Sequence, residues 1–562
     1  MKTINPLNLF FVTFLFFQPC LSLGLKADNF RLSIATVDSI ATNAGIEAFK
    51  AGGNAFDSAV AAGLVLGVVN GYNSGIGGGC FIVGRTSDSE KFTINGRETA
   101  PSKAHENLFV TDGKAQSQLS KEGALAIAVP GALLAYSELS KKYGRLPFRT
   151  HLINAAKIAK NGFQISESYA ERIKANEDQL RKHEASAKIF LDQNGNALKA
   201  GTKLQQVDLS NTYQKIAKNG TDWFYKGKFA EITHDWMIRN GGILTKEDLR
   251  DYHTTNPNPI VTQYKDFTLI GMPPPSSGGI HVAQILNILE NFNLQNVKPQ
   301  SPKYYHLISE AMKLAFADRA HWLGDPAFAN VPKGLISKKY AKFLAEKIDL
   351  NKTIRVKSHN TPPGADQDFF NKHTTHFCCS DDKGNWVSIT STINTSFGSK
   401  VIIPGTGVLM NNEMDDFSIR PGVPNAFGLI GNESNKVEGG KRPLSSMSPT
   451  IILRDNVPVL ATGAAGGPTI ISQTVLTILN TLEYGMSISE ALAKPRFHHQ
   501  WKPDVIRIEK SAGAHIISSL REKGHNLKVY ESFGSTQSIS NINDQANAAH
   551  DKRSGGKSVV LP

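Results

Sequence analysis

Cysteine is scarce in this sequence, with four residues among 562. Loss of an N-terminal leader containing Cys20 would leave Cys80 and the neighbours Cys378 and Cys379. An odd number that includes an adjacent pair excludes a disulfide framework, because a bridge between neighbouring strand residues would be strained. No Cys and His spacing indicates a metal site. We therefore expect three free, packed thiols and no metal.

Long apolar runs are also rare. Lys2 provides a basic start, an apolar run covers residues 9–17, and polar and small residues lead to Lys26. The run is too short for a comfortable membrane span and is typical of a signal peptide, so we assign 1–27 to a leader for a periplasmic or secreted protein. An N-terminal anchor is the alternative. Because no second run is long enough, we expect no stable membrane span.

Acidic residues are fewer than basic ones, and the net charge is +13. The lysines are scattered, and no arginine-rich run or basic motif interleaved with aromatic residues is present, so we expect no nucleic-acid partner. Attraction to anionic surfaces or acidic substrates fits the charge better. With 40% hydrophobic and 20% charged residues, the composition is globular and can form a large core.

The first two thirds of the chain are rich in helical patterns. We predict helices at 42–51, 57–69, 131–143, 151–161, 272–290 and 303–321. A glycine-rich loop at 74–84 leads into a strand rather than a helix, which excludes the P-loop and dinucleotide contexts. A strand within 92–101 ends in a turn that presents Arg97. The polar, proline- and glycine-containing stretch 351–373 is the best candidate for a linker.

Short strands dominate after residue 374. We predict strands at 374–380, 386–393, 449–454 and 458–462, and helices at 468–483 and 514–523. Turn residues 381–385 separate the first two strands, which predicts a hairpin centred on Lys383. Facing residues in such a hairpin have numbers that sum to 766. Thr374 would then face Thr392, with partners about 5 Å apart.

Thr374 is a candidate nucleophile because it follows the linker directly. A threonine hydroxyl needs a base beside it, and one solution is the free α-amine of the same residue. An internal Thr374 gains that amine only if its hydroxyl attacks the carbonyl of His373 and water hydrolyses the resulting ester. A threonine that merely stabilises a strand is the simpler alternative. Cys378 or Cys379 as the nucleophile is another.

Downstream residues provide the groups that an amino acid would need in a pocket. Glu413, Asp415 and Asp416 can hold an ammonium group, although such a cluster can also be a solvated acidic loop. Ser445 and Ser446 offer hydroxyl donors for a carboxylate. These two sites would hold the two charged ends of one amino acid.

Two further features complete this pocket. Gly466 and Gly467 precede Pro468, which we expect at the first position of an apolar helix. Their N–H groups at a helix start would form an anion site, suitable for a tetrahedral oxyanion. Arg97 can bind a carboxylate in bidentate fashion.

With these motifs, the chain resembles the γ-glutamyltransferases of the N-terminal-nucleophile hydrolase superfamily. The resemblance extends from residue 51 to residue 539 and rests on TTHFCCSDDKGNWVSITSTINTSFGS (374–399), LMNNEMDDFS (409–418), KRPLSSMSPTI (441–451) and PRFHHQW (495–501). It implies an α/β fold of the α+β type, a four-layer αββα sandwich built from two chains of one precursor. A large subunit, 28–373, and a small subunit, 374–562, would form one structural unit.

The resemblance implies a role for each candidate residue. Thr374 would be the nucleophile of self-cleavage at His373–Thr374 and of turnover, and Thr392 would hydrogen-bond to it. The residues implied to hold the α-carboxylate of the γ-glutamyl group are Arg97, Ser445 and Ser446. Those implied to hold its α-amino group are Asn394, Glu413 and Asp416. The oxyanion hole would come from Gly466 and Gly467.

The implied reaction is ping-pong and needs no cofactor. Thr374 attacks the γ-amide of glutathione or a related compound, cysteinylglycine leaves, and water or an amino acid or dipeptide takes the γ-glutamyl group. Related acylases, polyglutamate depolymerases and an unprocessed, non-enzymatic binding protein are the alternatives.

Two segments depart from the family pattern. Ala464, Ala465, Pro468 and Thr469 surround the two glycines where the family usually has Ser-Pro-Gly-Gly-Ser-Arg. In the lid-like segment 421–433, Phe427 stands where a tyrosine is common, which removes one possible hydrogen bond. These changes bear on acceptor preference and on the shielding of the pocket from water.

Overall fold

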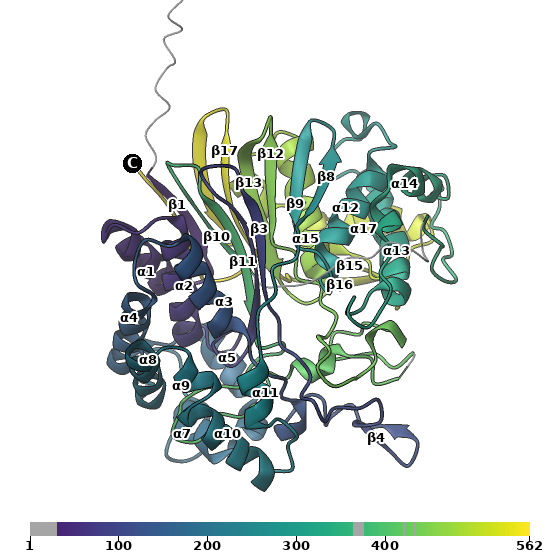
Figure 1. Cartoon of the computed structure of the whole chain (residues 1–562). Coiled ribbons are helices and arrows are strands. Elements are labelled where there is room, and N and C mark those ends of the chain that lie inside the picture. The colour runs from purple at the N-terminus through teal and green to yellow at the C-terminus, as the bar shows by residue number, and fades with distance from the viewer. Residues whose placement is uncertain (1–30, 364–375, 421, 432) are drawn as a thin grey trace, which may run out of the picture.

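The computed structural model describes residues 31–363, 376–420, 422–431 and 433–562. Two six-stranded antiparallel sheets form its centre (Figure 1). The first has the strand order β19-β1-β10-β11-β2-β3, with bounds Lys557–Leu561, Leu32–Thr36, Phe377–Asp381, Trp386–Thr392, Gly79–Arg85 and Lys91–Gly96. The second has the order β18-β17-β13-β12-β9-β8, with bounds Gln545–His550, Ser535–Ile542, Val457–Ala465, Thr450–Arg454, Phe267–Gly271 and Ile260–Tyr264.

The two sheets face each other across an apolar cluster. Phe81 and Cys378 of the first sheet share this cluster with Ile270 and Ile451 of the second. Cys379 belongs instead to the cluster on the opposite face of the first sheet, as expected for neighbours on a strand. The prediction that Cys80, Cys378 and Cys379 are free and buried is confirmed.

Helices cover the outer face of each sheet (Figure 1). Those packed beside the first sheet are α1 (Ser39–Lys50), α2 (Ala55–Val69), α3 (Ala132–Tyr143), α4 (Phe148–Asn161) and α8 (Val207–Asn219). Those beside the second are α12 (Ser277–Leu289), α13 (Pro302–Trp322), α14 (Lys338–Ala345), α15 (Thr469–Ile478) and α17 (Ala514–Glu522).

Shorter elements complete the described chain. The remaining helices are α5 (Glu167–Ala175), α6 (Glu177–Arg181), α7 (Glu184–Phe190), α9 (Asp222–Tyr225), α10 (Lys228–Arg239), α11 (Lys246–Asp251) and α16 (Ile488–Ala493). A small third sheet contains β14 (Phe497–His498), β15 (Ile506–Glu509) and β16 (Leu527–Tyr530). The two-stranded pairs are β4 (Val110–Thr111) with β5 (Lys114–Ala115), and β6 (Phe163–Gln164) with β7 (Lys203–Leu204).

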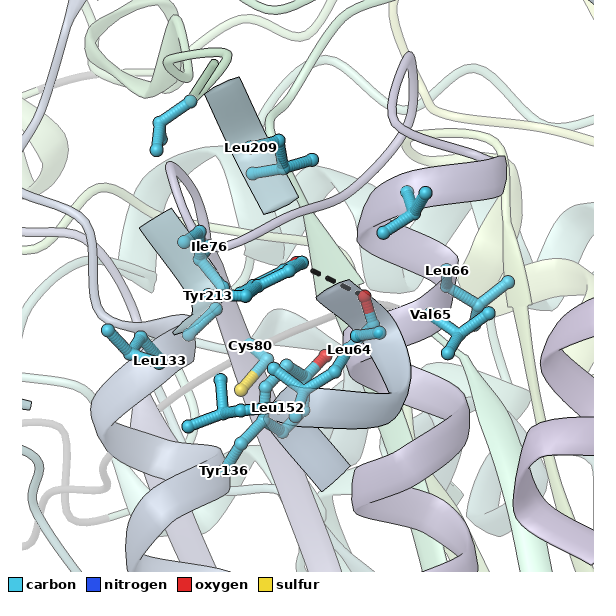
Figure 2. Packing of buried hydrophobic residues seen from close by; sticks show 14 of the residues in the cluster. Leu64, Val65, Leu66, Ile76, Cys80, Leu133, Tyr136, Leu152, Leu209 and Tyr213 are labelled. Carbon is cyan, nitrogen blue, oxygen red and sulfur yellow. Dashed lines mark hydrogen bonds between the residues drawn. The ribbon is translucent and has the colours of Figure 1, made fainter. Parts of the chain in front are cut away.

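Helix α2 is buried along its whole length, and its small residues make this possible. A Cβ atom at Gly63 would lie 2.9 Å from Tyr136 Cζ, and one at Gly67 would lie 3.1 Å from Tyr213 Oη. Tyr213 Oη donates a hydrogen bond of 3.1 Å to the carbonyl of Leu64 (Figure 2). The two glycines thus let both tyrosine rings approach the helix backbone, which brings α3 and α8 close to α2.

Most predicted elements are present with boundaries shifted by a few residues. The predicted helix at 468–483 is confirmed in part, since α15 starts at Thr469, after Pro468, and passes into a π-turn at Leu479–Glu483. Residues 351–363 of the predicted linker contain no helix or strand, and 364–373 lie outside the described residues. Within the described part of the chain, no helix has the length and apolar character needed to cross a membrane. The predicted leader, 1–27, also lies outside that part.

Candidate active site

The hairpin of β10 and β11 has the predicted register. Phe377 pairs with Ile389 and Ser380 with Trp386, and in both pairs the residue numbers sum to 766. The predicted nucleophile Thr374 and its predecessor His373 lie outside the described residues. Their roles stay predictions, whereas the strand that would face Thr374 is fully described.

A pocket of about 740 Å³ opens at the end of β11. Its lining brings together most of the predicted site residues, namely Thr392, Asn394, Glu413, Asp416, Phe427, Ser445, Ser446, Gly466 and Gly467. These residues come from segments that are up to 75 positions apart, between 392 and 467. The pocket therefore gathers the groups that the sequence suggested for one amino-acid site.

Thr392 has a defined orientation at the pocket wall. Its Oγ1 accepts a hydrogen bond of 2.7 Å from the backbone N–H of Asn394, which leaves its own O–H to donate. Asn394 adopts a φ of 73°, and its Nδ2 donates to the carbonyl of Asn412 at 3.0 Å. The left-handed backbone at Asn394 thus turns the chain so that its N–H points back at the Thr392 hydroxyl.

Gly466 and Gly467 join β13 to α15 with φ values of 130° and 58°. Their carbonyls accept hydrogen bonds from Thr469 and Ile470, respectively. Among the described residues, neither glycine N–H has an acceptor. Two unpaired N–H groups at the wall of a pocket, just before a helix, form a site for an anion or an oxyanion.

Thr469 is one of the residues that depart from the family pattern, and it has a structural role in the glycine turn. Its Oγ1 donates to the Gly466 carbonyl at 2.8 Å and accepts from Gln473 Nε2 at 2.9 Å. This hydroxyl closes the turn that holds the two glycines. Pro468 precedes the helix instead of occupying its first position, so that part of the prediction was wrong by one residue.

Arg97 lies behind the pocket and does not line it. Its side chain is fully buried, and Nη2 lies 2.7 Å from Asp416 Oδ2, while Nη1 pairs with Glu413. Glu98 Oε2 is 3.5 Å from the same Nη1. The guanidinium therefore fixes the positions of the acidic groups, and its predicted contact with a substrate carboxylate stays a prediction.

Three carboxyl groups surround this single guanidinium: those of Glu98 and Glu413 are buried, and that of Asp416 is partly buried. Burial raises the pKa of Glu413 and of Asp416, although the Arg97 charge opposes this effect. Burial also raises the pKa of Glu98 to about 7. Because like charges this close cannot all be ionised, we infer that the group retains a proton near neutral pH.

Arg319 is a pocket residue that the sequence analysis missed. It lies in the last turn of α13, its Nη2 donates to Ser446 Oγ at 2.9 Å and its Nε donates to Ser277 Oγ at 2.9 Å. Burial lowers its pKa to about 10, so the guanidinium is still charged at neutral pH. A positive charge behind Ser446 favours a carboxylate at the Ser445–Ser446 end of the pocket. The available signal was the pair of adjacent charged residues Asp318 and Arg319 near the end of the predicted helix at 303–321.

Phe427 packs against Gly467. A Cβ atom at Gly467 would lie 2.6 Å from Phe427 Cδ1, so the ring contacts the turn directly. The segment around it is tied to the acidic groups, because Asn425 Nδ2 donates to Asp416 Oδ1 at 3.2 Å and the Ala426 N–H donates to Asp415 Oδ2 at 2.9 Å. Phe427 thus lines the pocket, and its role as a lid stays a prediction.

Within the described residues, one buried cluster away from this pocket has metal-ligand chemistry: His306, Glu310 and His525. His306 Nδ1 is 2.7 Å from His525 Nε2, and its Nε2 is 2.7 Å from the carbonyl of Asp349. Lys313 Nζ lies 2.9 Å from Glu310 Oε1 and supplies the positive charge there. The cluster is thus a connected polar network between α13 and the C-terminal segment.

Comparisons with known proteins agree with this geometry. Residues 41–561 match the family model described as Gamma-glutamyltranspeptidase. The glutathione hydrolase proenzyme of Escherichia coli (strain K12) is 41% identical over 530 residues, which cover 93% of this chain and 91% of that protein. The glutathione hydrolase proenzyme of Bacillus subtilis (strain 168) is 38% identical over 527 residues, or 90% of this chain and 87% of that protein.

Solved structures are similar as well. A cephalosporin acylase from Bacillus halodurans superposes with a TM-score of 0.84 at 26% identity, covering 95% of this chain and 96% of that one. A gamma-glutamyltranspeptidase from Helicobacter pylori superposes with a TM-score of 0.55 at 36% identity, covering 59% of this chain and 94% of that one. The mixed α/β fold is therefore shared with both kinds of protein.

Proposed function

The chain belongs to the gamma-glutamyltranspeptidase family, and we propose that it is an exported enzyme that cleaves the γ-glutamyl amide of glutathione and related compounds. It is a glutathione hydrolase by its relationship to the proenzymes of that name over about 90% of the chain. The leader 1–27 would direct export. The two facing sheets and their outer helices would form the four-layer αββα sandwich of N-terminal-nucleophile hydrolases, assembled from subunits 28–373 and 374–562.

Self-cleavage would activate the enzyme. The Thr374 hydroxyl attacks the carbonyl of His373, and the peptide C–N bond breaks as the ester forms, which frees the α-amine of Thr374. Water then hydrolyses the ester, which restores the hydroxyl and leaves a carboxylate on His373. The amine then serves as the base for the hydroxyl of the same residue. Thr392 supports this assignment, because the register of the described pairs, if extended by three residues, would place Thr374 opposite Thr392, and the Thr392 O–H is available to donate.

Turnover would proceed through a γ-glutamyl ester of Thr374. The hydroxyl attacks the γ-carbonyl while the α-amine accepts its proton, and the oxyanion is stabilised by the N–H groups of Gly466 and Gly467. Collapse expels cysteinylglycine, whose amine takes the proton. Water, or the amine of an amino acid or dipeptide, then attacks the ester and releases glutamate or a new γ-glutamyl compound.

The pocket has separate places for the two charged groups of the substrate. Ser445 and Ser446, backed by Arg319, would hold the α-carboxylate, and Asn394, Glu413 and Asp416 would hold the α-ammonium group. The N–H groups of Gly466 and Gly467 in the same pocket, which have no acceptor among the described residues, carry the proposal, because an acyl-transfer site requires such donors and a binding protein does not.

The similarity to a cephalosporin acylase supports a second candidate, an amide hydrolase for substrates without an α-ammonium group. The acidic groups at the pocket wall favour γ-glutamyl substrates over this alternative, because Glu413 and Asp416 share the single guanidinium of Arg97. An α-ammonium group would add positive charge beside them, which a glutaryl side chain cannot supply.

N-terminal sequencing and intact mass of the purified protein provide the first test. We expect a fragment that begins Thr374-Thr375-His376, whereas Thr374→Ala should remain one chain. Glutathione, a glutaryl amide and polyglutamate are then compared as substrates, and glutathione should be preferred. A wild-type chain that stays intact would contradict the enzyme and favour the binding protein. A processed chain that prefers the glutaryl amide or polyglutamate would favour the related enzymes.

A further inference from the structure

The pocket extends well past the groups assigned to the γ-glutamyl part of the substrate. Its further lining includes Asn70 and Tyr72, which follow α2, and Tyr169 and Arg172 on α5. At about 740 Å³ it falls in the range of sites for ligands larger than one amino acid. This outer part has no role in holding the γ-glutamyl group, so it is available to the rest of the substrate.

Arg172 supplies a positive charge to this outer part. Its Nη1 donates to Ser396 Oγ at 2.8 Å, and its Cζ lies 5.2 Å from the centre of the Tyr72 ring. In the described chain, no carboxylate lies within salt-bridge distance of Arg172. The hydroxyl and the ring orient the guanidinium, and most of its N–H donors remain for a ligand.

The other arginines of the pocket are already engaged. Arg553 pairs with Glu509 at 2.7 Å and with Asp551 at 3.4 Å, so its charge is compensated. Arg319 is buried against Ser277 and Ser446, at the end assigned to the α-carboxylate. Arg172 is therefore distinct among the pocket arginines, as an oriented guanidinium on the Ser396 side with no carboxylate within salt-bridge distance among the described residues.

The distances along the chain fit a short peptide. Ser396 follows Thr392 by four residues, which span at most about 14 Å when extended. Positive φ values at Asn394 (73°) and Phe397 (60°) turn this segment and shorten the span. A cysteinylglycine group extends about 7 Å from the scissile amide to its terminal carboxylate. Arg172 Nη1 bonds to Ser396 Oγ at 2.8 Å, so its position relative to Thr392 has the same upper limit, apart from the lengths of the side chains.

We propose that Arg172 binds the terminal carboxylate of the peptide on the leaving-group side of the scissile bond. This inference rests on the proposed γ-glutamyl hydrolase function and adds a preference to it. Substrates whose leaving group ends in a free carboxylate, such as glutathione, bind better than those with a neutral end. A dipeptide that accepts the γ-glutamyl group places its carboxylate at the same guanidinium.

The test compares glutathione with glutathione whose glycine carboxylate is amidated. The measured quantity is the ratio of kcat/KM for the acid to kcat/KM for the amide. In Arg172→Gln we expect this ratio to fall about tenfold, because a charge-assisted hydrogen bond is lost only for the acid. Arg172→Lys should retain part of the preference. Ser396→Ala should lower the ratio less, because it only loosens the guanidinium.

Lys174→Gln is the matched control, since it removes one positive charge from the same helix. Lys174 Nζ pairs with Glu177 at 2.8 Å and does not line the pocket, so the ratio should stay at its wild-type value. An equal loss for acid and amide in Arg172→Gln, or no loss for either, would overturn the inference while leaving the proposed function intact. A processed wild-type protein that cleaves neither compound overturns both.

Discussion

Gly467 combines two constraints at one residue. Its φ of 58° disfavours any side chain, and a Cβ atom would lie 2.6 Å from Phe427. Gly467→Ala should displace both the N–H group and the phenyl ring, so we expect kcat to fall about 100-fold, as when one oxyanion donor is lost. Steady-state kinetics on a γ-glutamyl substrate measure this.

Gly405→Ala is the control for Gly467→Ala, because it introduces a similar backbone strain without displacing the oxyanion donor or Phe427. Gly405 has a similar φ of 72°, but a Cβ atom there would meet nothing within 4 Å. We expect this variant to lose about 1 kcal/mol of stability with kcat unchanged. Equal losses of kcat in the two variants would mean that strain alone explains Gly467→Ala.

Glu98 should make the stability depend on pH. Burial raises its pKa from 4.5 to about 7 in the folded protein, so the folded state binds this proton more tightly than the unfolded state. Its stabilising contribution is complete below pH 4.5 and is lost as the pH rises through about 7. One full proton corresponds to about 1.4 kcal/mol per pH unit.

Glu98→Gln keeps the shape of the side chain without a titrating group. Urea unfolding between about pH 5 and 8 should therefore show a flatter dependence in this variant than in the wild type. Parallel curves for the two proteins would show that Glu98 does not hold the proton and that Glu413 or Asp416 does.

At the scale of elements, the hairpin of β10 and β11 offers a matched pair of threonines. Thr392 and Thr390 lie on the same face of β11. Thr392 Oγ1 accepts from Asn394 at 2.7 Å, whereas Thr390 Oγ1 is buried with no partner in the described chain. Thr392→Val should slow self-cleavage at least tenfold and cost about 1–3 kcal/mol, because the Asn394 N–H loses its acceptor.

Thr390→Val should be neutral or slightly stabilising, since it removes an unsatisfied buried hydroxyl. Densitometry of the processing time course and the Tm of each precursor provide the measurements. If both valine variants slow self-cleavage equally, the effect comes from the strand and not from the Thr392 hydroxyl.

The hairpin also shows what the sequence can predict. Its register follows from local information, because five turn residues and two flanking strands fix the centre on Lys383. The motifs also placed Ser445, Ser446, Gly466 and Gly467 correctly in one pocket. Contacts between distant segments had no comparable signal: Arg319 meets Ser446 across 127 positions, and Arg97 meets Asp416 across 319. Such pairings depend on packing, which no local pattern reports.

At the scale of the whole molecule, the strand order shows that the two predicted subunits contribute strands to the same sheets. In the first sheet, β1 lies between β19 and β10, and β11 pairs with β2, so strands from before and after residue 374 are neighbours at three places. In the second sheet, β9 pairs with β12. The two predicted subunits therefore share both sheets as well as the buried network of His306 and His525.

After cleavage at His373–Thr374, the two fragments should consequently stay associated in one folded protein. We expect the two fragments to co-elute in size-exclusion chromatography at the volume of uncleaved Thr374→Ala, and to separate only in denaturant. Elution of the fragments in separate peaks without denaturant would contradict the shared sheets.

Because each sheet contains strands from both predicted subunits, self-cleavage changes how the mature protein can refold. A single precursor chain folds at a rate that does not depend on its concentration, but two separate fragments must first meet before β1 can find β10 or β19. Renaturation of the matured enzyme thus becomes a second-order reaction, in competition with aggregation of exposed strands. The covalent link between the two subunits would therefore assist folding only before self-cleavage. After cleavage, the lifetime of the active enzyme would depend on how slowly it unfolds.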